Sequence, residues 1–200
     1  MVIFIIGDFG RVLRGEGENV FDPGGAKPCE LLADLRKTYS ILDLGIGSDQ
    51  TQHVLWRLQN GDLEGYTAKM FTVMIGTNNG GRDEASIAEA IRRIVGLIRE
   101  RHPESKIVLM PIFPRNAKPD DAARAANDRI NAIIADLADG WLADLFGCGT
   151  VRWLDFNDKF LEPDGTLTKK VMDDLLHPNA NGYRIWWENM HPVVKEIVGK

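Results

Sequence analysis

The chain has 200 residues, of which 44% are apolar and 26% charged, and these are the proportions of an ordinary globular protein. Its length predicts a single domain over residues 1–200, which buries roughly 70% of the surface that the unfolded chain exposes. The net charge is −5, from 24 basic and 29 acidic residues without a basic run, so nucleic acid is not expected as a partner.

Cysteine usage and apolar runs bear on whether the protein is disulfide-bonded, metal-binding, membrane-spanning or secreted. Cys29 and Cys148 are far apart in the sequence and fit no metal spacing. They are interpreted as reduced thiols, although two cysteines leave a disulfide open. No apolar run approaches the length of a membrane span, and the segment 1–6 lacks the basic start and the length of a secretory signal. A cytoplasmic location is the default prediction, with an omitted upstream segment left open.

Short β-rich runs recur along the chain, each followed by a turn or a glycine-containing loop. The first, Val2–Ile6, is wholly apolar and ends in Gly7-Asp8, a pattern typical of a buried parallel strand that leads into a loop. Comparable runs follow it at intervals. The sequence therefore predicts strands over about 2–6, 40–44, 70–75, 106–111 and 151–154.

Segments with helical periodicity lie between these runs. In 83–101 the apolar residues recur at spacings of three and four, with charges on the opposite face. Similar patterns predict helices over 50–58 and 120–139. A last helix is predicted from about Asn179, with a kink or a restart at Pro192, because proline cannot donate the backbone hydrogen bond.

Strand–helix alternation at this spacing predicts right-handed βαβ units, and hence an α/β fold with a parallel sheet covered by helices on both faces. In such sheets ligands bind beyond the carboxyl ends of the strands. Asp8, Gly47 and Asn78 all follow predicted strands directly. The sequence therefore places candidate site residues at one edge of the sheet.

The spacing Asp174-Leu175-Leu176-His177 is the most informative local feature. An acid three residues before a histidine can share a turn with it and hold the imidazole in one tautomer, which prepares the ring to act as a base. Three further blocks accompany it in the sequence: Gly45-Ile46-Gly47-Ser48-Asp49 with the helix Thr51–Leu58, then Gly76-Thr77-Asn78-Asn79, and Pro114-Arg115.

In their order along the chain, with Asp174 and His177 last, these blocks resemble the SGNH (GDSL-type) hydrolases, especially the branch like the catalytic subunits of platelet-activating-factor acetylhydrolase. The resemblance covers most of the chain, and the long second block is its most specific part. It implies a three-layer αβα sandwich with a flavodoxin-like five-stranded sheet in the order 2-1-3-4-5. It also implies an ester hydrolase that acts on short acyl groups, such as acetyl on a lipid or a carbohydrate.

The resemblance further assigns roles in the site. His177 would be the catalytic base and Asp174 the carboxylate that orients it. The Ser48 backbone N–H and the Asn78 side chain would donate to the oxyanion, and Phe9 stands at the position of the nucleophile. A small-molecule ester would be the substrate, with no cofactor and no metal, and a homodimer is left open.

Two departures from the family pattern concern these roles. Ser48 replaces a glycine, and its N–H donor survives if the loop does not require a positive φ there. Phe9 replaces the nucleophilic serine of the Gly-Asp-Ser block, and its ring would fill the space that an acyl carbonyl needs. The mismatch is confined to about Phe9 to Arg14, because the resemblance resumes at 15–20. Genuine divergence and a sequence or cloning error both remain open.

Other interpretations apply to the same residues. Asn78 could be a turn residue, His177 a histidine at a helix start, and Asp174 a surface charge. At the level of function, the alternatives are a catalytically inactive module that binds acylated or carbohydrate ligands, and a flavodoxin-like nucleotide or flavin binder. The latter is disfavoured because no phosphate-binding glycine loop follows the first strand. Ser48 as a substitute nucleophile is a further alternative.

Overall fold

The computed structural model describes residues 2–7, 34–147 and 149–199. Within them, five strands form one sheet in the order β2-β1-β3-β4-β5, and all four pairings are parallel. The strands are β1 (Val2–Gly7), β2 (Ser40–Asp43), β3 (Met70–Met74), β4 (Lys106–Leu109) and β5 (Val151–Trp153). This is the parallel sheet that the strand–helix alternation predicts.

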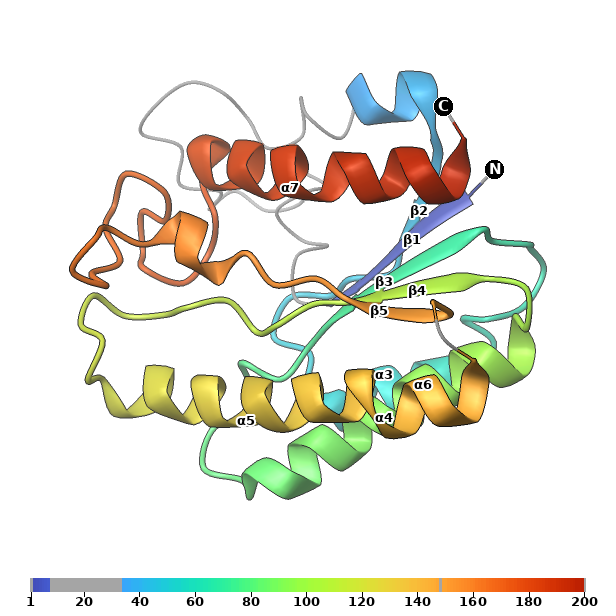
Figure 1. Cartoon of the computed structure of the whole chain (residues 1–200), viewed down its shortest axis with the longest axis horizontal. Coiled ribbons are helices and arrows are strands. Elements are labelled where there is room, and N and C mark those ends of the chain that lie inside the picture. The colour runs from blue at the N-terminus through green and yellow to red at the C-terminus, as the bar shows by residue number, and fades with distance from the viewer. Residues whose placement is uncertain (1, 8–33, 148, 200) are drawn as a thin grey trace.

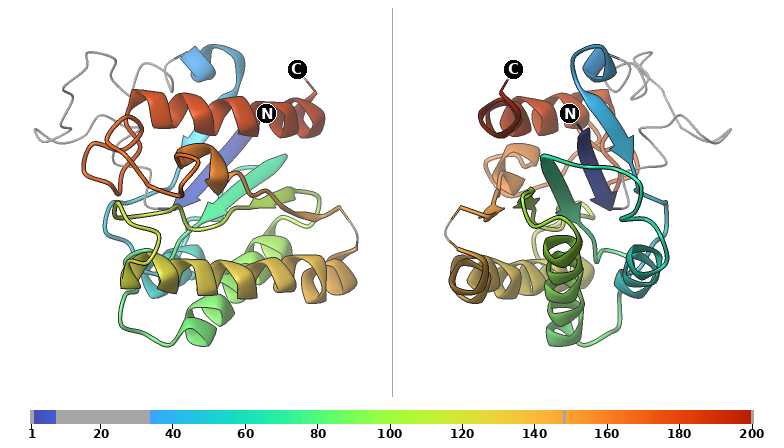
Figure 2. Two further views of the ribbon diagram at one scale, coloured as in Figure 1. Left: turned by 60° about the vertical axis from the view of Figure 1, so that its left-hand side comes forward. Right: turned by 90° about the vertical axis from the view of Figure 1, so that its right-hand side faces the viewer.

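Helices cover both faces of the sheet and complete three layers (Figure 1). Helix α7 (Ala180–Val198) lies on one face, beside a short helix over 34–38. The other face carries α3 (Thr51–Gln59), α4 (Glu84–Arg101), α5 (Ala122–Asp139) and α6 (Trp141–Phe146). Seen along the sheet edge in Figure 2, α4 lies between α3 and α5. A 3₁₀ helix, η1 (Asn157–Phe160), follows β5. The predicted αβα architecture is confirmed.

The central strands divide their side chains between two apolar cores. On β3, Phe71 and Val73 contribute to the core under α3, α4 and α5, whereas Met70 and Met74 contribute to the core under α7. Consecutive side chains of a strand point to opposite faces, so a strand covered on both faces is apolar throughout. This explains why these strands appear in the sequence as continuous apolar runs rather than as alternating ones.

The fourth strand is shorter than predicted, because β4 ends at Leu109 instead of residue 111. The next segment gives its backbone hydrogen bonds to a side chain of α5. The Ile112 N–H donates to Asn131 Oδ1 at 2.7 Å, and Asn131 Nδ2 donates to the Ile112 carbonyl at 2.8 Å. A side chain thus replaces the neighbouring strand as the partner of this backbone. β2, β3 and β5 end one residue earlier than predicted.

Of the kink or restart predicted at Pro192, the restart is wrong, because α7 is a single helix over 180–198 with the proline inside it. Met190 before Pro192 and Val193 and Val194 after it are buried in the same core. Packing of an apolar face supplies most of the stability of a helix in a protein, and here it outweighs the hydrogen bond that proline cannot donate.

No helix within the described ranges is long and apolar enough to cross a membrane. The cytoplasmic location stays a prediction. Phe9, Cys29 and Cys148 lie outside the described residues.

Candidate active site

The loop before α7 holds the aspartate and the histidine that the sequence singles out. Asp174 Oδ2 lies 2.6 Å from His177 Nδ1, so the acid holds the imidazole as the three-residue spacing predicts. The other carboxylate oxygen, Oδ1, accepts from the backbone N–H of His177 at 2.8 Å and of Leu176 at 3.0 Å. One carboxylate therefore fixes both the turn and the ring.

The protonation of the pair follows from these contacts. Partial burial raises the pKa of Asp174, but the hydrogen bonds from the His177 ring and backbone N–H outweigh it and hold the pKa below its ordinary value. Asp174 is therefore ionised at neutral pH, and it can accept a hydrogen bond from the tautomer of the ring in which Nδ1 carries the proton. His177 Nε2 then carries the lone pair, and it makes no hydrogen bond with any described residue. Such a nitrogen is suited to take a proton.

The start of α7 anchors this loop. Asn179 is the N-cap of α7, and its side chain accepts from the N–H groups of Asn181 and Gly182, while its own N–H donates to the Val171 carbonyl at 2.9 Å. A Cβ at Gly182 would lie only 2.4 Å from the Val171 oxygen, so only glycine permits this approach. Gly182, three residues after the Asn179 cap, thus lets the loop pack on the helix.

Asn78 and Asn79 follow β3 and contact the loop that follows β2. Asn78 Nδ2 donates to the Asp49 carbonyl at 3.2 Å, and Gln50 Nε2 donates to the Asn78 carbonyl at 2.9 Å. The buried Asn79 accepts from Thr51 N–H at 3.0 Å and donates to Thr51 Oγ1 at 3.1 Å, so it satisfies a free N–H in the first turn of α3. The two candidate oxyanion segments are therefore held together.

The expectation that the loop needs no positive φ at Ser48 is wrong, because φ there is +69°. The loop does require the left-handed conformation at this position. Serine adopts it here and keeps its backbone N–H, at a strain of about 1–2 kcal/mol for a residue with a Cβ. The glycine of the family pattern avoids this strain.

An ion-pair network between this loop and α3 stabilises the same loop. Asp49, directly after Ser48, is buried, and its Oδ2 accepts from Arg57 Nη2 at 2.5 Å. Arg57 Nη1 donates in turn to Asp62 at 2.5 Å. Asp49 thus links the backbone that holds Asn78 to the middle of α3. Asp49 and Arg57 both belong to the block of residues 45–58, but no local pattern in the sequence indicates their ion pair.

Two consecutive residues after β4 connect the Asn78 loop with the Asp174–His177 loop. Arg115 Nη1 donates to the Thr77 carbonyl at 3.1 Å and to Thr77 Oγ1 at 3.3 Å, next to Asn78. The Asn116 N–H donates to the Leu175 carbonyl at 2.9 Å, between Asp174 and His177. The Pro114-Arg115 pair is a signal for the first connection, but no local pattern indicates the second.

The structure thus gathers the candidate residues at the carboxyl edge of the sheet, on neighbouring loops, as the topology of a parallel sheet demands. Asn78 is linked to the Ser48–Asp49 loop directly, and to the Asp174–His177 loop through residues 115 and 116. No hydrogen bond joins His177 to Asn78 itself within the described residues. Phe9 lies outside them, so its place relative to His177 stays a prediction. No described group of His, Cys, Asp and Glu has a metal-binding arrangement.

We expect the left-handed strain at Ser48 to be measurable. Ser48→Gly and Ser48→Ala both remove the hydroxyl, but only alanine keeps the Cβ. The glycine variant should therefore exceed the alanine variant in free energy of unfolding by about 1 kcal/mol, as determined by urea titration. Equal stabilities would show that the loop relaxes out of the positive φ.

A parallel αβα sandwich with an Asp–His pair at the carboxyl edge of its sheet is an architecture suited to hydrolytic enzymes. Residues 15–185 match the GDSL-like lipase/acylhydrolase family, and the chain belongs to this family. The match begins after Arg14 and so includes the loops of Ser48, Asn78 and Asp174–His177 but not Phe9.

Similar proteins agree with this membership. The chain is 34% identical over 172 residues to the platelet-activating factor acetylhydrolase IB subunit alpha1 of Pongo abelii, covering 86% of this chain and 71% of that protein. It is 32% identical over 169 residues to the alpha2 subunit of Rattus norvegicus, covering 84% and 70%.

Solved structures share the fold at low sequence identity. A GDSL-like lipase from Bacteroides thetaiotaomicron matches with a TM-score of 0.72 and 16% identity, over 98% of this chain and 87% of that one. The psychrotrophic esterase EstA from Pseudoalteromonas matches with a TM-score of 0.66 and 18% identity, over 100% and 99%.

Proposed function

We propose that this chain carries an ester-hydrolase site for short acyl esters, such as acetyl groups on a lipid or a carbohydrate. The observation that carries the proposal is the Asp174–His177 pair. Its side chains share a 2.6 Å hydrogen bond, and His177 Nε2 makes no hydrogen bond with a described residue. Membership of the acylhydrolase family supports the reaction class. The acetylhydrolase names of the relatives support a short acyl group.

In this proposal His177 Nε2 takes a proton from the attacking hydroxyl, and Asp174 stabilises the imidazolium that forms. The tetrahedral intermediate then needs donors that are already aimed at its oxygen, and one such donor contributes about 3–4 kcal/mol. The Ser48 N–H and the Asn78 amide are the proposed donors. The hydrogen bond from Asn78 Nδ2 to the Asp49 carbonyl supports a fixed position for that amide, and the contact of Gln50 with the Asn78 carbonyl supports a fixed backbone beside it.

The residue at the nucleophile position argues for a second candidate function. Phe9 offers no hydroxyl, so the nucleophile position of the family pattern provides no proton for His177 to take. A chain with the base and the oxyanion loop but no nucleophile would be an inactive member of the family that binds acylated or carbohydrate ligands. The start of the family match at residue 15 agrees with a departure confined to the preceding segment.

The rate of the unaltered chain tests whether the site hydrolyses esters without a serine at position 9. We expect purified protein to hydrolyse p-nitrophenyl acetate little faster than its His177→Ala variant, because neither contains an activated hydroxyl. The absorbance of the released p-nitrophenolate gives the rate for both proteins. Far-UV circular dichroism spectra check that both are folded. Some hydrolysis above the rate in buffer is compatible with the proposal, because oxyanion donors alone can leave about 10³–10⁴-fold catalysis over water.

Two outcomes would contradict the assignment of the site. Robust activity that Ser48→Ala abolishes would make Ser48 the nucleophile. Robust activity that neither Ser48→Ala nor His177→Ala reduces would place the chemistry elsewhere in the molecule.

A further inference from the structure

The peptide bond between Leu175 and Leu176 lies within the turn of the Asp–His pair. Its N–H donates to Asp174 Oδ1 at 3.0 Å, and the same oxygen accepts the His177 N–H. Its carbonyl, that of Leu175, accepts the Asn116 N–H at 2.9 Å. Because a peptide group is planar, a partner that fixes the carbonyl also fixes the direction of the N–H. Asn116 therefore acts on the carboxylate that holds the imidazole.

Asn116 and Leu175, which share this hydrogen bond, both adopt the left-handed conformation, with φ of +59°. A leucine does so only where the surrounding structure holds it there, because its Cβ is crowded in this conformation. Asparagine adopts the conformation more readily. Within the turn, the Leu175 N–H donates to the Met172 carbonyl at 3.0 Å, and from outside it the Asn116 N–H binds the Leu175 carbonyl. The conformation of the turn thus depends on both contacts.

The side chain of Asn116 anchors this contact to a helix. Asn116 Nδ2 donates to Asp121 Oδ1 at 2.7 Å. Asp121 is the N-cap of α5, and the same oxygen accepts from the N–H groups of Ala123 and Arg124. The hydrogen bond from Asn116 is the main reason that the pKa of Asp121 lies below its ordinary value, so the acceptor is ionised at neutral pH. The buried face of α5 packs in the core, which fixes the anchor relative to the sheet.

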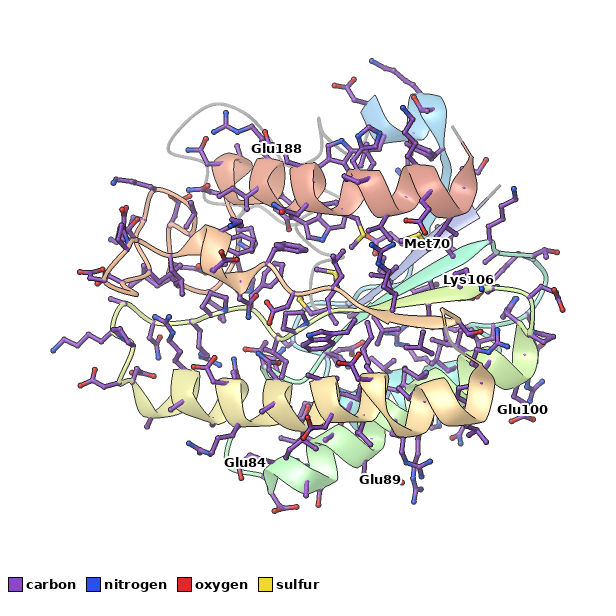
Figure 3. All side chains as sticks on the ribbon, in the orientation of Figure 1. Met70, Glu84, Glu89, Glu100, Lys106 and Glu188 are labelled. Atoms are coloured by element: carbon purple, nitrogen blue, oxygen red, sulfur yellow. The ribbon has the colours of Figure 1, made fainter. Side chains whose placement is uncertain are left out.

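The topology brings the start of α5 close to the loop of the pair. In Figure 3, Lys106 marks the amino end of β4, and α5 begins near the opposite end of the sheet, on the same side of the molecule as the loop before α7. Ala117 adds a second connection, since its carbonyl accepts the Leu167 N–H at 2.9 Å. The segment between β4 and α5 is therefore bound to the chain that leads into α7.

We propose that Asn116 is a positioning residue for the base of the site. Its side chain is anchored to α5, and its N–H fixes the 175–176 peptide. This peptide orients the Asp174 carboxylate, which in turn keeps the proton of the neutral His177 ring on Nδ1 and leaves Nε2 free to act as the base. The inference rests on the proposed function and deepens it, because it concerns the same base.

The tautomer of the His177 ring tests this role without any need for esterase activity. Two-bond proton–nitrogen correlation spectra of protein with isotope-labelled histidine, at about pH 9, distinguish the two tautomers of a neutral imidazole. In the unaltered chain His177, assigned with His177→Ala, should show one tautomer with its proton on Nδ1. The buried His102, whose Nε2 lies 3.1 Å from the Leu63 carbonyl, is an internal reference for the folded state.

Two substitutions remove the anchor and tolerate the left-handed conformation. Asn116→Asp keeps the size of the side chain but sets a second carboxylate against Asp121, and Asn116→Gly deletes the side chain and keeps the backbone N–H. In both, the His177 nitrogen shifts should move toward the average of the two tautomers, further in Asn116→Asp, while the His102 shifts stay unchanged. Combining Asn116→Asp with Asp121→Asn exchanges donor and acceptor. Because asparagine is also a good N-cap, this double variant should recover most of the original shifts.

Asn189→Ala is a matched control, because it removes an amide whose Nδ2 donates to a carbonyl within α7, that of Ile185, at 2.8 Å. It should leave the His177 shifts unchanged. The same result in Asn116→Asp and Asn116→Gly overturns the inference and leaves the proposed function standing. If charge repulsion unfolds Asn116→Asp, Asn116→Gly decides alone. A folded double variant no nearer to the unaltered chain than Asn116→Asp also overturns the inference. Mixed tautomers in the unaltered chain contradict the pair itself, and with it both proposals.

Discussion

Rebuilding residues 9–14 with the nucleophile segment of the family should raise the hydrolysis of p-nitrophenyl acetate by about 10³-fold or more. The base, its carboxylate and the proposed oxyanion loop are already present, and by this account only the activated hydroxyl is missing. Because a triad acts as a unit, adding its absent member restores far more than a proportional share of the rate. Initial rates of the rebuilt and unaltered proteins give the ratio.

The rebuilt protein should owe its activity to the candidate residues. Adding His177→Ala should return the rate to that of the unaltered chain. Adding Asp174→Asn should remove most of the gain in kcat, because an amide no longer selects the productive tautomer of the histidine. Phe9→Ser alone should rescue less than the whole segment, since Gly10 to Arg14 must also shape the turn that aims the hydroxyl. A rebuilt, folded protein without activity would contradict the proposed function.

Of the substitutions predicted to affect stability, removal of the positive charge beside Asp49 should lower the free energy of unfolding most. Arg57→Met deletes both ion pairs of Arg57 and leaves the Asp49 carboxylate, only 9% exposed, without its cation. Breaking one side of such a buried pair costs about 3–5 kcal/mol. Urea titration of the variant should show a decrease in the free energy of unfolding within this range.

Two further variants separate the buried charge from the lost packing. Asp49→Asn combined with Arg57→Met removes the orphaned charge and should recover part of the loss. Arg152→Met breaks an exposed pair and should change stability by less than about 1 kcal/mol. A loss for Arg57→Met as small as the loss for Arg152→Met would mean that water or a local rearrangement solvates Asp49.

Local patterns in the sequence already determine much of the fold and part of the site. The periodicity of 83–101 predicts α4 and its buried face, and the structure begins that helix at Glu84, one residue after the Asp83 cap. The three-residue spacing of Asp174 and His177 predicts their hydrogen bond, because a single turn brings the two side chains together. Short β-rich runs at intervals along the chain predict all five strands to within two residues.

Only the tertiary structure decides the features that depend on distant parts of the chain. β4 ends early because Asn131 of α5 binds the backbone of Ile112, and α7 continues through Pro192 because a core packs on both sides of it. The left-handed conformation of Ser48 and the connections of residues 115 and 116 to Thr77 and Leu175 have the same origin. Such contacts join residues remote in sequence, so they leave no periodicity or spacing that a local pattern could reveal.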